Sequence, residues 1–263
     1  MQEKDKSAVI VNRQSLADMA LRTRTPPPQA LKRWLRHKAR QLIYSVTALR
    51  RLVEREKMAP EENKAHWDDL MLGAQFSTYL GGTIDVDGSN AITSLMLKFH
   101  AVDRPAILDI GCSAGTLVSA VHSFERYFGT DVSSVAINAA RQIAAEIFPD
   151  RPGDINFETA DLRLFKPSAT FDVIVFNEVL YYLNCDQAVN EVHRFVKSLN
   201  TGGLIIVSMK DDGKSRAIFK LLSKDLEWVD GILWQRKPTT YDFAIRPNRE
   251  CPAFMVGALR MPQ

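Results

Sequence analysis

The sequence predicts an α/β fold in which helices cover a doubly wound, mostly parallel sheet of seven strands. Three observations predict this class. Short apolar runs alternate with helix-like segments between residues 106 and 209. Most of these runs end in polar or acidic residues, as buried strands do at the carboxyl edge of a parallel sheet. Two further strand-like runs follow near the C-terminus, and such an alternation of strands and helices builds a layered α/β domain.

The first strand, Ala106–Ile110, runs directly into a loop of small residues, Gly111–Thr116. Gly111 and Gly115 lack a Cβ atom, so the backbone there can adopt unusual dihedral angles and lie close to a ligand at the start of the next helix. Asp109 adds a negative charge beside the loop. That charge disfavours a pyrophosphate, whereas a cofactor with an ammonium group and a sulfonium centre gains from it. The loop therefore favours S-adenosylmethionine over NAD.

The same loop departs from the dinucleotide-binding pattern G-x-G-x-x-G. Ser113 and Thr116 stand where that pattern carries its second and third glycines. Cys112, which precedes Ser113, is most simply a small packing residue within the loop. The spacing of the small residues and the charge of Asp109 therefore both disfavour NAD.

Acidic residues also end the next two strands. The strand Tyr127–Asp131 ends in Asp131 about 20 residues after the glycine loop, where ribose hydroxyls need an acceptor. The run Ile155–Leu162 ends in Asp161, a carboxylate for an exocyclic amine, and in Leu162, whose backbone N–H can meet a ring nitrogen. We therefore expect Asp131 to bind ribose, and Asp161 and Leu162 to bind adenine.

The fourth run, Phe171–Glu178, is almost continuously apolar, which is typical of a strand buried in a parallel sheet. It brings Asn177 and Glu178 to the carboxyl edge, where open α/β sheets bind their ligands. Tyr181 and Tyr182 follow at the same edge, where a phenol can accept or donate a hydrogen bond. We expect this edge to face the substrate.

A helix over Gln187–Leu199 and a fifth buried strand over Leu204–Met209 follow. Leu226–Val229 and Ala253–Arg260 then provide the last two strands. Between them, Trp234–Cys251 is longer and more polar than a tight hairpin requires. This insertion either shapes a substrate pocket or forms a surface loop.

The order of these motifs resembles the class I S-adenosylmethionine-dependent methyltransferases. The glycine loop, Asp131, the turn Ala160–Leu162 and the strand end at Asn177 stand in family order, over roughly residues 100–260. The run Asn177–Leu183 also resembles the small-molecule branch, including the nodulation-type N-methyltransferases that act on an amino sugar. The resemblance implies a Rossmann-like sheet with a terminal antiparallel pair, S-adenosylmethionine as methyl donor and S-adenosylhomocysteine as product.

The family often has glycine where this chain has Ser113, so the serine narrows the approach to the methionine moiety. Residues 61–100 stand where the family builds a lid. Trp67 and Tyr79 in this region can either close over the cofactor or substrate, because aromatic faces attract positive charge, or pack in the core. The candidate cofactor-binding residues are Asp109, Gly111, Cys112, Ser113, Gly115, Asp131, Val132, Asp161, Leu162, Asn177, Trp67 and Tyr79.

The implied reaction is an in-line displacement at a methyl carbon. The enzyme chiefly holds nucleophile, carbon and sulfur in a line and keeps the site dry, so no metal is needed. An amine must be neutral to attack and a hydroxyl must lose its proton, so a base helps the hydroxyl more. The candidate catalytic residues are Glu178, Tyr181, Tyr182 and His66, the last because it stands in the lid region.

Residues 1–60 carry 14 Lys and Arg against 5 Asp and Glu, and the remaining residues have an acidic excess. Within this basic extension, apolar residues recur three or four apart from Gln29 to Met58, which predicts an amphipathic helix. Such a helix can lie on the domain, pair with a second copy in a homodimer, or bind RNA or an anionic membrane. The contact set for the last two partners is Arg33, Trp34, Arg36, Lys38 and Arg40.

We expect two parts in the chain: the basic N-terminal extension, residues 1–60, and a methyltransferase domain, residues 61–263. In the domain, 61–100 is the lid or substrate region and 101–263 the core. The apolar runs are shorter than the roughly 18–20 residues of a spanning helix. The three cysteines are odd in number and lack C-x-x-C spacing. These features predict a cytoplasmic protein, peripheral to a membrane if the helix binds one.

Missing motifs narrow the substrate. The N/D-P-P-Y/F turn that holds exocyclic nucleobase amines is absent, since Glu178 and Val179 follow Asn177, so no DNA substrate is expected. The leading function is methyl transfer to oxygen or nitrogen of a small molecule, such as a sugar or a natural-product intermediate. Two alternatives stay open. One is a methyltransferase of RNA, protein or a membrane-associated glycan recruited by the basic helix; the other is a non-catalytic cofactor-binding or scaffold subunit.

Overall fold

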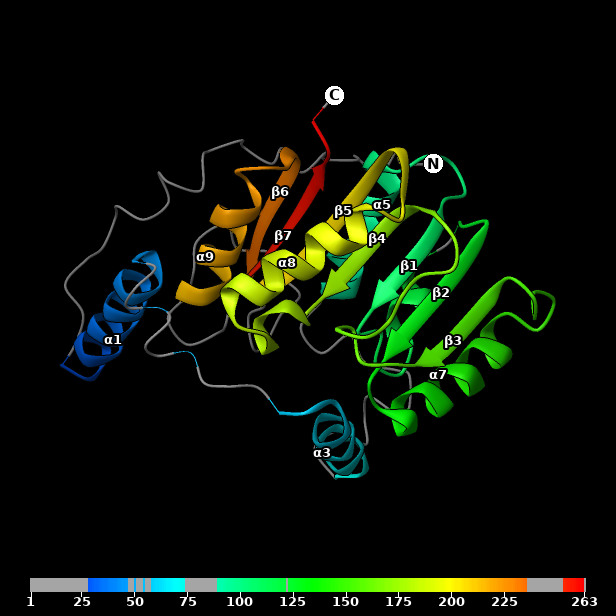
Figure 1. The fold of residues 1–263 in the computed structure, drawn as a ribbon, viewed down its shortest axis with the longest axis horizontal. Coiled ribbons are helices and arrows are strands. Elements are labelled where there is room, and N and C mark those ends of the chain that lie inside the picture. Colours follow the sequence, from blue (N-terminus) through cyan, green and yellow to red (C-terminus); the bar gives the residue numbers. More distant parts are fainter. Residues whose placement is uncertain are drawn as a thin grey trace, which may run out of the picture. The chain divides into compact units, whose positions relative to one another are not determined.

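The computed structural model describes residues 28–46, 50, 54, 58–73, 89–121, 123–235 and 253–262 (Figure 1). The chain forms two compact units, residues 1–36 and residues 37–263. The α/β sheet lies entirely in the second unit. Tyr79 and residues 236–252, which make up most of the predicted insertion, lie outside the described residues.

In the described part of the chain, one sheet of seven strands runs in the order β3-β2-β1-β4-β5-β7-β6. The first five strands pair in parallel, and β7 runs antiparallel to both β5 and β6. This confirms the predicted fold class. The chain order reverses between β1 and β4, the position at which such sheets bind ligands. The strands are β1 (Ala106–Ile110), β2 (Arg126–Asp131), β3 (Ile155–Thr159), β4 (Phe171–Asn177), β5 (Leu199–Lys210), β6 (Glu227–Gln235) and β7 (Ala253–Arg260).

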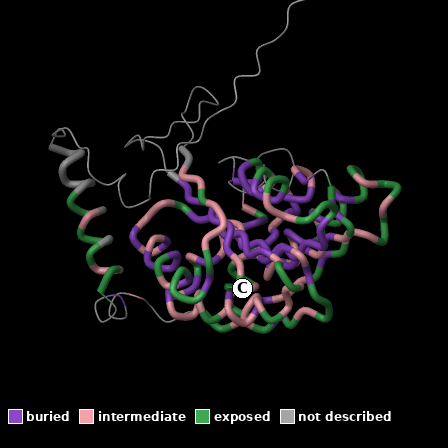
Figure 2. The backbone as a smooth tube through the Cα atoms, turned by 90° about the horizontal axis from the view of Figure 1, so that it is seen from above, coloured by how far each residue is buried: buried purple, intermediate pink, exposed green. Residues whose placement is uncertain are grey.

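Helices cover both faces of the sheet (Figure 1). Because neighbouring strand residues point to opposite faces, Phe176 packs with α8 and α9, whereas Val175 packs with α5, α6 and α7. Buried residues gather in the strands between these layers (Figure 2). The helices are α1 (Pro28–Ser45), α3 (Pro60–Leu72), α5 (Ser89–His100), α6 (Thr116–Ala120), α7 (Ser134–Ile147), the 3-10 turn η2 (Leu180–Tyr182), α8 (Cys185–Val196) and α9 (Gly213–Leu222).

Helix α1 is shorter than the predicted helix, which extends to Met58. It ends at Ser45, whose Oγ donates to the carbonyl of Leu42 at 2.7 Å. This bond offers the carbonyl an alternative partner to the backbone and weakens the helix there. Beyond the break, Val46 is not helical, Arg50 is helical again, and Glu54 and Met58 are not, so the prediction of one continuous helix from Gln29 to Met58 is wrong.

The fifth strand begins at Leu199, earlier than predicted, because Leu199 pairs with Phe171 of β4 across an irregularity in the ladder. Correspondingly, α8 ends at Val196 and not at Leu199.

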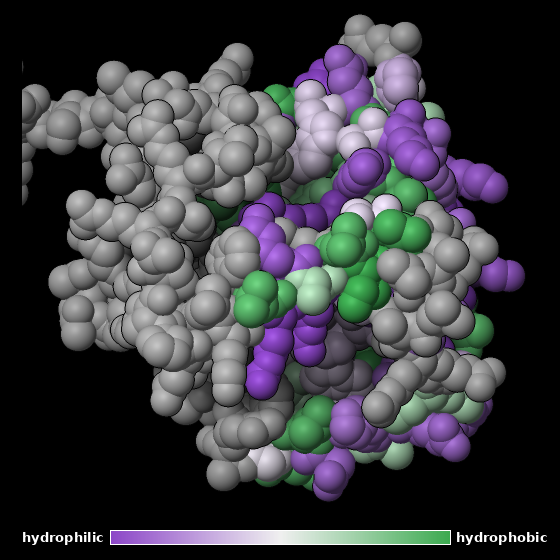
Figure 3. Space-filling view, turned by 90° about the vertical axis from the view of Figure 1, so that its left-hand side faces the viewer, coloured by the Kyte–Doolittle hydropathy of each residue, from purple (hydrophilic) through white to green (hydrophobic). Residues whose placement is uncertain are grey.

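No described helix has both the length and the apolar character that crossing a membrane demands. Figure 3 shows hydrophilic and hydrophobic side chains interspersed over the described part of one face.

Side-chain caps fix where the loops at the carboxyl edge turn into helices. Ser133 Oγ accepts from the backbone N–H of Ala136 at 3.2 Å at the start of α7. Asn184 Oδ1 accepts from Gln187 N at 2.9 Å, and the Gln187 side chain accepts in return from Asn184 N, a capping box at the start of α8. The loops after β2 and η2 therefore leave the sheet in defined directions.

Candidate active site

A cavity of about 580 Å³ lies between the carboxyl ends of the central strands and helix α3. Its volume is in the usual range of small-molecule sites. All the predicted site residues line it except Gly115 and Tyr79. Gly115 is the N-cap residue of α6, next to the lining residue Thr116, and Tyr79 lies outside the described residues. The topology thus brings together side chains that are far apart in the sequence.

The glycine loop reaches the cavity through left-handed backbone. Gly111 has a φ of 76°, and a Cβ there would lie 2.7 Å from the Val179 side chain, so no larger residue fits without movement. Gly115 has a φ of 73°. Ser113 has a φ of 51°, a value that is strained for a residue with a side chain. The loop keeps the sharp turn expected of it and stores strain at the serine.

Asp109, at the end of β1, is buried with 1% of its surface exposed. The Tyr127 hydroxyl donates to its Oδ2, and its Oδ1 has no partner among the described residues. Burial raises the pKa of Asp109 to about 7, although the Tyr127 bond opposes the rise. Burial also raises the pKa of the neighbouring Cys112 thiol. Cys112 is therefore neutral, and a cationic group of a cofactor would favour the charged form of Asp109.

Asp131 ends β2 and ties it to the glycine loop. Ser113 N donates to its Oδ2 at 3.0 Å, and Ser133 N donates to its Oδ1 at 2.9 Å. Burial raises the pKa of Asp131, and these hydrogen bonds oppose the rise. Each oxygen keeps a further lone pair, so the carboxylate can still accept from a ribose hydroxyl. Val132, the next residue, also lines the cavity.

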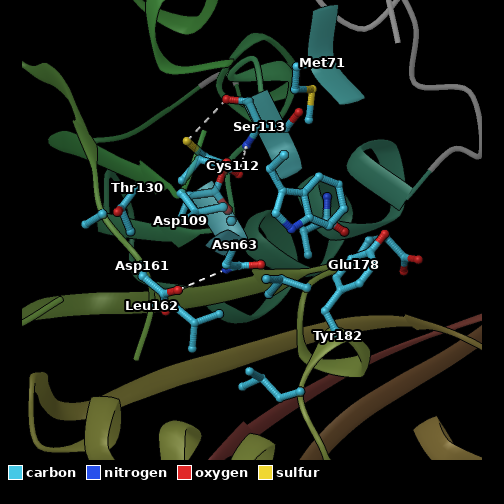
Figure 4. A pocket seen from close by; sticks show the side chains of 18 of the residues that line it. Asn63, Met71, Asp109, Cys112, Ser113, Thr130, Asp161, Leu162, Glu178 and Tyr182 are labelled. Atoms are coloured by element: carbon cyan, nitrogen blue, oxygen red, sulfur yellow. Dashed lines mark hydrogen bonds between the residues drawn. The ribbon is translucent and has the colours of Figure 1, made fainter. Parts of the chain in front are cut away.

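Asp161 is already surrounded by donors. Asn63 Nδ2 of α3 donates to its Oδ2 at 3.0 Å, as Figure 4 shows. Arg163 donates to both oxygens, with Nε at 2.8 Å from Oδ1 and Nη2 at 2.5 Å from Oδ2. Burial would raise the pKa of Asp161, but these hydrogen bonds outweigh it and hold the pKa below its usual value. The amide of Asn63 makes the contact that the sequence assigns to an exocyclic amine, while Leu162 lines the cavity beside it.

Helix α3 is fastened to the start of α7 by Asp68. Its Oδ1 accepts from Ser133 Oγ at 2.7 Å and from Val135 N at 3.2 Å, and its Oδ2 accepts from Ser134 Oγ at 3.1 Å. Burial opposes ionisation, but hydrogen bonds from Lys64 and these groups lower the pKa of Asp68 to about 2. A carboxylate at a helix N-terminus is also favoured by the helix dipole. Asp68 therefore holds α3 over the cavity.

The cavity face of α3 carries Asn63, Trp67 and Met71, which stand one helical turn apart. The Trp67 ring lies 4.8 Å from the Tyr182 ring at an angle of 85°. His66 is exposed at the rim, with its ring 6.0 Å from that of Trp67. Asn63 was not among the predicted site residues, although its four-residue spacing from Trp67 was a signal for it. The cover over the described cavity is α3.

Two asparagines join the end of β4 to α5. Asn177 Nδ2 donates to Asn90 Oδ1 at 2.6 Å, and Asn90 Nδ2 donates to Thr116 Oγ1 at 2.8 Å. This chain orients the Asn177 amide, whose Oδ1 is buried without a hydrogen-bond partner among the described residues. Asn177 lines the cavity, and this oxygen is the acceptor that its side chain would offer to a ligand N–H. Asn90 had no signal in the sequence, because it depends on how α5 packs on the sheet.

Glu178 and the two tyrosines form the other side of the cavity, where Figure 4 places Glu178 and Tyr182 together. Glu178 has a left-handed φ of 57° and accepts from Ser208 Oγ at 2.9 Å. The Tyr181 and Tyr182 rings are 4.6 Å apart. Burial and the charge of Glu178 raise the pKa of Tyr181, and burial raises the pKa of Tyr182. Both phenols are neutral hydrogen-bonding groups near pH 7, so Glu178 is the charged acceptor.

A family described as Methyltransferase domain matches residues 102–242, which span β1 to β6. This chain belongs to that methyltransferase family. Nodulation protein S of Sinorhizobium fredii is 33% identical over 127 residues, which cover 47% of this chain and 56% of that protein. The chain thus matches little more than half the length of this curated relative.

Solved structures of methyltransferases share the fold. The N-methyltransferase NodS of Bradyrhizobium japonicum WM9, in complex with S-adenosylhomocysteine, aligns with a TM-score of 0.52 at 23% identity, over 68% of this chain and 90% of that one. Magnesium protoporphyrin IX methyltransferase of Synechocystis PCC 6803, with bound S-adenosylmethionine, aligns with a TM-score of 0.56 at 15% identity, over 79% and 100%. The methyltransferase belongs to class I, whose cofactor is S-adenosylmethionine.

Proposed function

We propose that this methyltransferase transfers the methyl group of S-adenosylmethionine to a nitrogen or oxygen atom of a small molecule. One observation carries the proposal: a single cavity joins the glycine loop at Gly111 to Glu178, Tyr181 and Tyr182. Transfer in a line requires that donor and acceptor sites meet in this way. The neighbours named N-methyltransferase NodS and magnesium protoporphyrin IX methyltransferase support a small acceptor.

The residues at the loop end of the cavity offer groups that complement the cofactor. Asp131 would accept from the ribose hydroxyls, and the Leu162 N–H would meet a ring nitrogen of adenine. Asp161 would bind the exocyclic amine of adenine in place of the Asn63 amide, which occupies that position in the structure. The Asn177 Oδ1, which has no partner among the described residues, would accept from the ammonium group. When bound, S-adenosylmethionine supplies a methyl carbon made electrophilic by its sulfonium. Asp109 would balance the positive charge of the cofactor.

Nitrogen suits the acceptor end better than oxygen. Glu178 carries a negative charge at the acceptor end of the cavity. The Trp67 and Tyr182 rings also line the cavity, and their centroids are 4.8 Å apart. Carboxylates and aromatic faces both attract a protonated amine. The amine must lose its proton before it attacks, and Glu178 can accept that proton. A neutral hydroxyl gains little from a negative charge and aromatic faces, so these groups favour an amine as the acceptor.

Calorimetric titration of the purified chain with S-adenosylmethionine, S-adenosylhomocysteine and NAD tests the cofactor part. We expect binding of the first two only. The chain is then incubated with methyl-labelled cofactor and pairs of amines and alcohols that share a carbon skeleton, with RNA and protein as parallel samples. Label in the amines supports the proposal. Label confined to RNA or protein would replace it, and absence of cofactor binding would favour a scaffold subunit.

A further inference from the structure

A polar cluster outside the cavity joins the segment before α3 to the start of α8. Arg50 is buried, with 3% of its surface exposed, and its Nη2 donates to Asp186 Oδ1. Glu54 Oε1 accepts from the backbone N–H of Cys185 at 2.8 Å. Two side chains from the N-terminal segment therefore hold the first two residues of α8.

Helix α8 begins immediately after the turn that carries both tyrosines. The 3-10 turn η2 ends at Tyr182, and only Leu183 and the cap residue Asn184 separate it from α8. On the other side, Lys214 Nζ of α9 donates to the carbonyl of Tyr181 at 2.9 Å. The turn is thus held at two places. Lys214 of α9 binds the Tyr181 carbonyl, and Arg50 and Glu54 hold the start of α8 just after the turn. Its two rings line the cavity.

The cluster is costly to build. A buried guanidinium loses hydration, and the Arg50 Nε has no hydrogen-bond partner among the described residues. Tyr44, near the end of α1, packs against the hydrophobic core that α8 and α9 form with the sheet. An apolar contact of this kind can hold the chain before α3 in place without a buried charge. Only the arginine side of the pair is buried, because the Asp186 side chain is 38% exposed. Ion pairs with a buried member contribute little net stability, and their best-attested role is to set one register between packed elements. Here the contacts fix the position of Arg50 and Glu54 relative to the start of α8, which follows the loop after β4.

We propose that Arg50 and Glu54 are positioning residues that hold η2 in place, so that Tyr181 and Tyr182 stand against the acceptor end of the cavity. The inference rests on the proposed function for the role of the tyrosines, but the restraint on η2 is a separate property. The N-terminal segment thereby completes the methyltransferase site from outside it.

Hydrogen exchange measured by mass spectrometry on the full chain tests the restraint without any acceptor. Glu54→Ala removes the partner of the Cys185 N–H, whereas Glu54→Gln keeps an oxygen at the same place. We expect amides 180–187 to exchange at least about tenfold faster in the alanine variant and near the native rate in the glutamine variant. Glu146→Ala, an exposed position on α7, is the matched control and should change nothing. Unchanged exchange over 180–187 in Glu54→Ala overturns the inference.

Two further readouts separate positioning from general damage. The S-adenosylhomocysteine affinity of Glu54→Ala should stay within about twofold of native, because the cofactor end is untouched. With the amine that the native chain methylates best, kcat/KM for the amine should fall about tenfold and recover in Glu54→Gln. An equal loss of cofactor affinity would mean that Glu54 only supports the fold. If the native chain methylates nothing, the proposed function fails while the exchange comparison still decides the restraint.

Discussion

At the scale of single residues, Asp109 links the cofactor site to pH. Its pKa of about 7 lies above the ordinary value of 3.8, so the folded chain holds this proton more tightly than the unfolded chain. Such a group stabilises the fold in acid, and that contribution is lost as the pH rises from about 4 to about 7. Asn cannot ionise. The stability of Asp109→Asn relative to native, without cofactor, should therefore grow by roughly 2–4 kcal/mol between pH 5 and pH 8.

Urea unfolding of both proteins at the two pH values measures this difference. The negative charge of Asp131 contributes to the raised pKa of Asp109, so the measured difference includes the coupling between these two carboxyl groups. The Tyr127 hydroxyl can donate to the Asn oxygen as it does to Asp109, so the packing is preserved. A difference that does not change with pH would show that Asp109 is ionised throughout this range.

Glu178 is the residue whose charge the proposed reaction uses. Glu178→Gln keeps the acceptor for Ser208 Oγ and the side-chain shape, but it cannot take a proton. We expect kcat for an amine to fall about 100-fold, with the affinity for S-adenosylhomocysteine preserved. Tyr182→Phe, which removes only a neutral phenol, should cost less than about tenfold. Initial rates and calorimetry on the same preparations measure both effects, and native turnover in Glu178→Gln would exclude a role as proton acceptor.

At the scale of elements, Asp68 of α3 accepts three hydrogen bonds from the start of α7, and this makes the role of α3 testable. Asp68→Ala removes the acceptor for Ser133, Ser134 and Val135 at the start of α7. The helix should then detach from the cavity more often, and S-adenosylhomocysteine should bind about tenfold more weakly. Asp69→Ala, the exposed neighbour on the same helix, is the control and should bind as native does. Equal affinities for both variants, by calorimetry, would mean that α3 does not close the site.

The elements that the sequence predicted best are those that are buried on both faces. In Phe171–Asn177 every residue except Asp172 and Asn177 is buried, so its apolar run left little choice of structure. Asp131 and Asp161 were predictable because the end of a parallel strand fixes their place. Asn63 and Arg50 were not, since their partners lie far away in the sequence and depend on how helices pack. The early end of α1 was missed because the amphipathic pattern of the sequence continues past Ser45, where the helix ends.

At the scale of the whole molecule, the compact unit from residue 37 onward predicts where the chain can be shortened. Tyr44, Arg50 and Glu54 all contact the core or α8, so they belong to this unit. A chain that begins at residue 37 should bind S-adenosylhomocysteine within about twofold of native. A chain that begins at residue 61 loses these contacts, and its Tm should fall by roughly 5 °C or more. Thermal unfolding and calorimetry compare the two shortened chains with the full chain. Equal Tm values would show that the Tyr44, Arg50 and Glu54 contacts do not stabilise the fold.

The same shortened chain separates catalysis from recruitment. Much of the basic excess of the extension precedes residue 37, whereas the cavity belongs wholly to the later unit. If the extension attracts RNA or an anionic membrane, the full chain should sediment with one of them at low salt and release it as salt rises. The chain that begins at residue 37 should lose most of this binding and keep the labelled-methyl activity on small amines. If the shortened chain still binds RNA or the membrane, the binding surface lies on the methyltransferase unit. A polyanionic substrate would then be favoured over a small amine.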